Sequence, residues 1–69
     1  MAGNTQQLDY QVARSGSMFL FLPQNEAARR HLEDHSGDEA QWFGGGLVVE
    51  HRYAGDLAAA LQRDGFIVR

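Results

Sequence analysis

The chain contains no cysteine, no lysine and a single proline. Without cysteine it has neither a disulfide framework nor a thiolate metal site, which are the usual staples of small proteins. Its longest apolar runs are five or six residues, far below the roughly twenty that a membrane-spanning helix needs. The N-terminal residues also lack the basic and apolar regions of a secretion signal. We therefore expect a cytoplasmic protein that has no membrane partner.

The length and composition limit the chain to one small domain. Of its 69 residues, 43% are hydrophobic, which is more than a disordered segment contains, so we expect a packed core. A domain of this size buries only roughly 60% of the surface that its unfolded chain exposes. Self-association or a stable partner would bury more. We expect residues 1–7 to form a flexible tail and residues 8–69 to form the domain.

The charge is weakly negative, because nine acidic residues and six arginines give a formal net charge of −3. A nucleic-acid-binding face needs concentrated positive charge, since counterion release from phosphates supplies much of the affinity. The arginines are scattered, which disfavours direct binding of DNA or RNA: they stand at positions 14, 29, 30, 52, 63 and 69. The use of arginine alone, with frequent alanine and glycine, fits GC-rich coding and hints at a GC-rich bacterium or one of its mobile elements.

The first half of the domain has the pattern of a β-hairpin. Alternating apolar and polar residues at 8–12 predict a strand with one face in water. Residues 14–17 are turn formers, and Gly16 can take a positive φ. The apolar run at 18–22 has the length of a second strand, and Pro23 ends it because proline cannot donate to a ladder.

A helix is predicted next. Asn25 can cap it by accepting a backbone N–H, and Glu26 places negative charge in its first turn, which the helix dipole favours. Ala28 and Leu32 form a thin inner face that lets the helix lie close to a sheet. Ser36 stands near the predicted end of the helix.

The segment that follows this helix is irregular. Residues 38–41 predict one helical turn, and Trp42 and Phe43 are expected to fold back onto the core. A glycine run occupies 44–46. A phosphate-binding loop follows a strand and opens a helix, whereas these glycines precede a strand. We interpret the run as a tight turn.

The C-terminal part predicts a strand at 47–49, a second helix that begins near Tyr53, and a last strand at 66–68. Gly65 is placed for the left-handed C-terminal cap of this helix. Phe66 is placed for the hydrophobic contact that accompanies such a cap.

These elements give an α+β fold in which a small mixed β-sheet, in the order β-β-α-β-α-β, carries both helices on one face. The other face of the strands at 18–22 and 47–49 is then uncovered, although both runs are apolar on both sides. An open apolar face on so small a protein favours association, and a homodimer is one expectation. The expected core contains Phe19, Phe21, Leu32, Trp42, Val48, Leu57, Leu61 and Ile67.

Two groups of residues could carry chemistry. His31 and His35 are spaced i,i+4, which places two imidazoles on one helix face, but the pattern is not that of a zincin and no thiolate offers a third ligand. Glu50, His51 and Tyr53 stand at a strand end, where a Glu–His pair could do acid–base work. No nucleophile stands beside them, and so short a chain has little volume for a pocket. We expect surface histidines, no catalytic residue, no metal and no cofactor.

Four carboxylates lie within seven residues, at 33–39. One interpretation is a solvated helix end and loop. The other is an acidic patch that meets a basic, nucleic-acid-binding surface on another protein, since complementary charge speeds association and excludes wrong partners. The aromatic residues just beyond the patch are of the types that anchor interfaces. The partner-binding candidates are therefore Glu33, Asp34, Asp38, Glu39, Trp42 and Phe43.

Several short segments of the chain together form a recognisable pattern. They are Gly16-Ser17-Met18, Pro23, Ala40-Gln41-Trp42-Phe43-Gly44, Val48-Val49-Glu50-His51-Arg52-Tyr53 and Asp64-Gly65-Phe66. In these segments, residues 16–69 resemble a group of short, uncharacterised bacterial and phage-associated proteins. No motif in this group has an assigned chemical role. Small acidic proteins of mobile elements include anti-CRISPR and anti-restriction inhibitors, some of which imitate nucleic acid, and the link to them is an analogy of size, charge and setting.

The function that we expect is that of a non-catalytic, protein-binding inhibitor from a mobile element. A CRISPR effector exposes arginine and lysine to hold its DNA, so an acidic, DNA-mimicking surface could occupy that groove. A small homo-oligomeric interaction module is the alternative. A direct nucleic-acid binder and an enzyme are less favoured by the charge and by the residues present.

Overall fold

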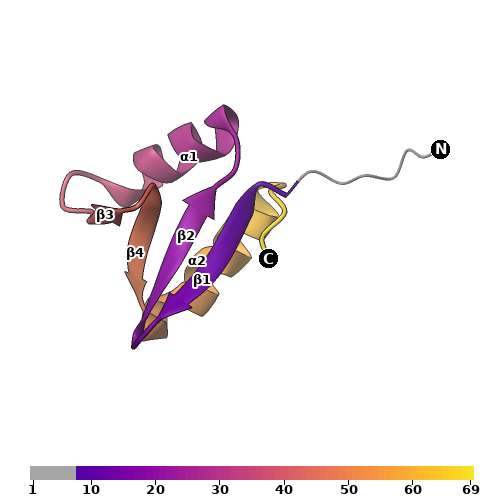
Figure 1. The fold of residues 1–69 in the computed structure, drawn as a ribbon. Helices are drawn as coiled ribbons and strands as arrows, with labels where there is room; N and C mark the ends of the chain where they lie inside the picture. The colour runs from indigo at the N-terminus through magenta and orange to yellow at the C-terminus, as the bar shows by residue number, and fades with distance from the viewer. Residues whose placement is uncertain (1–7) are drawn as a thin grey trace.

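The structure is a computed structural model, and it describes residues 8–69. The predicted flexible tail, residues 1–7, lies outside the described residues. The α+β class is confirmed, because a four-stranded sheet is combined with two helices (Figure 1). In chain order the elements are β1 (Tyr10–Ser15), β2 (Met18–Pro23), α1 (Glu26–Ser36), β3 (Trp42–Phe43), β4 (Gly46–Glu50) and α2 (His51–Arg63).

The strands are arranged in the order β1-β2-β4-β3, and every neighbouring pair is antiparallel. The element order is thus β-β-α-β-β-α, and it differs from the predicted order at two places. Residues 42–43 add a strand, and the C-terminal segment forms only a parallel bridge between Tyr10 and Val68 instead of a full strand. This bridge is the one parallel pairing in the described part of the chain.

Glycines make both hairpin turns. Two residues join β1 to β2, and Gly16 there has a φ of 61°. Two glycines join β3 to β4, and the φ angles of Gly44 and Gly45 are 57° and 81°. Positive φ at both central residues is the signature of the type I′ turn, whose twist matches that of paired strands. Residues 38–39 form a non-helical turn, so the predicted helical turn at 38–41 is absent.

The helix termini follow local signals. Asn25 caps α1, as predicted, by accepting a hydrogen bond of 2.8 Å from the backbone N–H of Ala28. Helix α2 begins at His51, two residues before the predicted start, because it follows β4 directly. Gly65 ends α2 with a φ of 97°, and the N–H of Phe66 donates to the carbonyl of Leu61 at 3.1 Å. This is the predicted glycine cap.

Both helices pack on one face of the sheet, since residues from each join one core cluster with β1, β2 and β4. Figure 1 shows α2 crossing behind the strands. Of the predicted core, Trp42 is 39% exposed and Val48 and Ile67 are only half-buried outside the cluster, so these three assignments were wrong. The buried core consists of Tyr10, Phe21, Ala28, Leu32, Leu47, Val49, Ala54 and Leu61.

The other face of the sheet carries no helix. Phe21 and Leu47 are cross-strand partners that point into the core, so the residues that alternate with them point away from the helices. Polar side chains stand on this outer face along β1 and at the end of β4, at Gln11, Ser15 and Glu50. Between them the outer side chains are apolar and half-buried or exposed. We call it the open sheet face; it contains Met18, Leu20, Leu22, Phe43 and Val48.

Tyr10 ties the start of β1 to α1. Its side chain is fully buried, and its hydroxyl donates to the backbone carbonyl of Ala28. Its ring meets Phe66 edge-on at 5.4 Å. Burial, followed by the nearby carboxylates of Asp9 and Asp64, raises the pKa of Tyr10 to about 12.

Within residues 8–69, neither helix is long and apolar enough to cross a membrane.

The β3–β4 turn can be tested with a pair of glycine substitutions. Gly45→Ala places a Cβ on a residue whose φ is 81°, so we expect it to lower the free energy of unfolding by about 1 kcal/mol or more. Gly55→Ala is the matched control, because Gly55 lies inside α2 with no atom within 4 Å of an added Cβ. It should raise the free energy of unfolding by about 0.5–1 kcal/mol. Both variants can be measured by urea denaturation. Equal changes in their free energies of unfolding would contradict the conclusion that the turn requires glycine at position 45.

The buried Tyr10 predicts a loss of stability at high pH. Below about pH 10 the phenol of Tyr10 is neutral in both the folded and the unfolded protein, so it does not make the free energy of unfolding depend on pH. Between about pH 10 and pH 12 the unfolded chain releases this proton while the folded protein keeps it, because the pKa of Tyr10 is raised to about 12. The free energy of unfolding should therefore fall by about 2–3 kcal/mol across this range.

The measurement is chemical denaturation at pH values from neutral to strongly alkaline. Tyr10→Phe should be less stable at neutral pH and should lose much of the alkaline decline. Tyr53→Phe removes an exposed phenol and should behave as the parent protein does. An unchanged decline in Tyr10→Phe would show that another group causes it.

Candidate functional site

The predicted acidic residues lie at the end of α1 and in the loop to β3, and all four are exposed. Glu33 is partly neutralised, because Arg29 donates to its carboxylate at 2.9 Å. Asp34, Asp38 and Glu39 form no ion pair with any described residue. The uncompensated negative charge is thus greatest in the loop.

Trp42 and Phe43 form β3, the short edge strand that follows this loop. They were expected to pack on the core, but their exposed fractions are 39% and 70%. Trp42 pairs with Leu47 and Phe43 pairs with Gly46, so the two rings point to opposite faces of the sheet. The Gly-Gly turn after them is the sequence signal that could have identified this hairpin.

The positive charges near this region are engaged with carboxylates. Arg29 contacts Glu26 at 2.9 Å as well as Glu33, and Arg30 contacts Glu26 at 3.3 Å. The hydrogen bond and charge of Arg29 lower the pKa of Glu26, and those of Glu26 raise the pKa of Arg29. Arg52 contacts Glu50 at 3.4 Å. The arginines of α1 therefore pair with carboxylates of their own helix.

Glu50, His51 and Tyr53 do not converge on one point. The carboxylate of Glu50 accepts a hydrogen bond from Arg52. The imidazole of His51 lies 5.6 Å from the ring of Phe19, centroid to centroid. Tyr53 turns toward a different part of the molecule, the space between the helices. This arrangement forms no acid–base pair with a shared substrate position.

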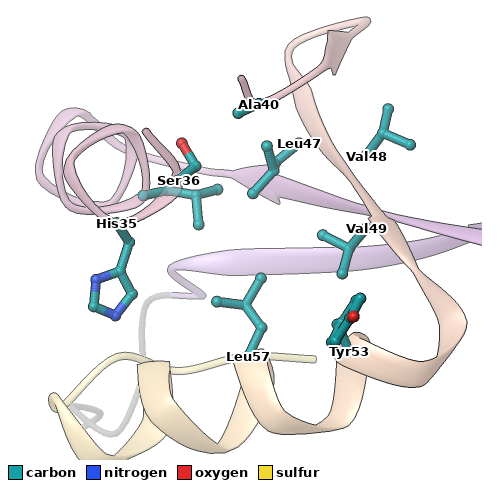
Figure 2. A pocket seen from close by; sticks show the side chains of 9 residues that line it. His35, Ser36, Ala40, Leu47, Val48, Val49, Tyr53 and Leu57 are labelled. Carbon is teal, nitrogen blue, oxygen red and sulfur yellow. The ribbon is translucent and has the colours of Figure 1, made fainter. Parts of the chain in front are cut away.

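An open cavity of about 420 Å³ lies between α1, α2 and β4. Its volume exceeds what was expected of so short a chain. Figure 2 shows His35, Leu57 and Tyr53 pointing into it, whereas Val48 points away toward the open sheet face. The cavity is lined by Leu32, His35, Ser36, Ala40, Leu47, Val48, Val49, Tyr53 and Leu57.

His31 and His35 lie beside one another, and the structure adds a neighbour that their spacing did not indicate. Nε2 of His31 is 2.9 Å from Oδ2 of Asp64, the C-cap residue that follows the last residue of α2. One potential ligand atom from each of the three side chains lies within 4.8 Å of the others. A contact between residues 31 and 64 depends on how the helices pack, so no local signal could have predicted it.

Comparisons with known proteins gave no match to a family model, to a curated protein or to a solved structure. The resemblance to short bacterial and phage-associated proteins therefore stays a prediction that rests on the residues themselves.

Proposed function

We propose that this protein is a non-catalytic protein-binding protein that contacts its partner through the region around β3. The observation that carries this proposal is the exposure of Trp42 and Phe43, at 39% and 70%, on an edge strand beside an acidic loop. Small soluble proteins bury most of their large aromatic side chains, and tryptophan is among the residues that most often dominate binding energy at interfaces.

The charges around β3 support an acidic contact surface. Asp38 and Glu39 precede the two aromatic residues by only a few positions and form no ion pair with any residue in 8–69. Uncompensated carboxylates steer a basic partner toward the surface and exclude acidic ones. The aromatic side chains would then supply most of the affinity, because exposed ion pairs contribute little.

The partner that fits this surface is a protein with a basic, nucleic-acid-binding groove. An inhibitor of a bacterial defence complex, such as a CRISPR effector, is the specific case we propose. The acidic loop would occupy positions that nucleic-acid phosphates otherwise take. Direct binding of nucleic acid is disfavoured, because Arg29, Arg30 and Arg52 contact carboxylates of their own chain.

Charge reversal tests the acidic surface. Replacing all four acids by lysine (Glu33→Lys, Asp34→Lys, Asp38→Lys and Glu39→Lys) should abolish partner binding and leave the fold intact, since exposed charges contribute little to stability. The loop pair alone, Asp38→Lys with Glu39→Lys, should weaken binding at least about tenfold. Binding can be measured by calorimetry against a purified defence complex, with circular dichroism to verify folding.

The matched control for the loop pair is Glu50→Lys with Asp56→Lys. It changes the net charge by the same amount as the loop pair, but at the start of α2. It should bind almost as the parent protein does. If the folded quadruple variant binds or inhibits as well as the parent protein, the acidic surface is not the contact site. If the control variant loses as much affinity as the loop-pair variant, affinity for the partner depends on net charge alone and not on the position of the acids.

The open sheet face favours a second candidate, a homo-oligomeric interaction module. Three of its side chains, Met18, Leu20 and Leu22, stand on the central strand β2, where no helix covers them. Contiguous apolar surface of this kind marks an interaction site more often than a free surface. Two copies that pack these faces together would form a two-layer sheet core.

Self-association can be tested by light scattering and sedimentation. The parent protein should form dimers whose fraction rises with concentration, and Met18→Lys with Leu20→Lys should shift the molecule to monomer, because two charges would have to be buried. Ala59→Lys on the exposed side of α2 adds charge away from this face and should leave the dimer intact. A concentration-independent monomer in the parent protein would remove this candidate.

A further inference from the structure

His31 and His35 stand one helical turn apart on the side of α1 that faces α2. Their rings lie close, with centroids 5.1 Å apart and planes inclined by 33°. Two imidazoles at i,i+4 on one helix face form half of a familiar zinc-binding arrangement. The pair lacks only ligands from another element.

Asp64 provides such a ligand from the end of α2. Its Oδ2 lies 2.9 Å from Nε2 of His31, and its backbone N–H is held by the last turn of α2, with the carbonyl of Ala60 at 3.1 Å. The glycine cap at Gly65 then reverses the chain. The backbone of Asp64 is therefore held by hydrogen bonds of α2, and only its side chain has to adjust.

The distances suit one metal ion. A tetrahedral zinc ion takes imidazole nitrogen and carboxylate oxygen at about 2.0–2.2 Å, so its ligand atoms stand about 3.3 Å apart. The three candidate atoms already lie within 4.8 Å of one another. His35 and Asp64 are exposed, so small rotations of their side chains can close the remaining distance without moving the backbone.

The surroundings of His31 favour a defined orientation. Its ring packs on Phe66 at 4.7 Å, centroid to centroid. Its side chain is 30% exposed. Fixing one imidazole in this way reduces the entropy that ordering a ligand costs. The side chain of His35 is free to complete the site from the cavity between the helices.

We propose that His31, His35 and Asp64 form a binding site for one divalent transition-metal ion, such as Zn²⁺. Two imidazoles and one carboxylate are ligands that suit zinc, and three protein ligands leave a position for water or another molecule. The bound ion would replace the hydrogen bond between His31 and Asp64 by two metal–ligand bonds and so join α1 to the end of α2. An ion that binds only the folded chain also raises its melting temperature.

The test uses the full chain without a histidine tag, freed of metal by a chelator. Calorimetric titration with ZnCl₂ should give one ion per chain, and the melting temperature should rise when Zn²⁺ is present. His35→Ala should weaken binding at least about tenfold, because it removes one of three ligands. Asp64→Asn should weaken it similarly. His51→Ala is the matched control, since His51 stands at the other end of α2, and it should bind as the parent protein does.

The His35→Ala variant separates this proposal from a purely structural contact. The hydrogen bond between His31 and Asp64 does not involve His35, whose side chain is exposed. Without Zn²⁺ the variant should therefore melt as the parent protein does, and only the increase caused by Zn²⁺ should be lost. No heat of binding in the parent protein, or equal binding by His35→Ala, would overturn the proposal.

Discussion

The fold depends on one corner, where β1, α1 and the C-terminal segment meet. Asp9 holds this corner together: its carboxylate accepts hydrogen bonds from Asn25 at 2.9 Å and from the backbone N–H of Ile67 at 2.8 Å. Tyr10, the next residue, is fully buried and donates its hydroxyl to the carbonyl of Ala28. Two consecutive side chains thus connect segments far apart in the sequence. A chain without disulfides needs such polar ties, because its hydrophobic core alone supplies only a small margin of stability.

The same corner explains why the sheet has one covered and one open face. Because Tyr10 and Asp9 draw α1 and the end of α2 to one side, both helices share a single core. Within residues 8–69, no further helix or strand covers the outer side. Gly46 reduces the exposed area there, because it lets the side chain of Leu22 lie across β4, with Cδ2 only 2.9 Å from where a Cβ would stand. The remaining apolar surface is a consequence of this topology.

Local signals in the sequence were enough to predict much of the fold, but hydrophobicity by itself misplaces the exposed aromatic residues of β3. The cap at Asn25 and the glycine at Gly65 act within a few residues, and both predictions are confirmed. The prediction that Trp42 lies in the core was wrong. Its hydrophobicity favours burial, but the Gly-Gly turn after Phe43 makes Trp42 part of an edge hairpin. The roles of Asp9 and Asp64 depend on contacts between residues that are 16 to 58 positions apart. Only the folded structure brings the residues of these contacts together.

Helix α1 connects the three surface features while keeping them apart. Successive residues on a helix are rotated by about 100°. Leu32 points into the core, so His31 and His35 fall together on the flank toward α2, and Glu33 falls on the opposite flank. Asp34, about 200° from Leu32, faces away from the sheet. Glu33 and Asp34 therefore lie on different sides of α1 from the two histidines, and the open sheet face lies on the far side of the strands. Phe43 belongs both to the region around β3 and to the open sheet face. The other residues chosen for substitution each lie on one surface only, so each proposed binding activity can be tested separately.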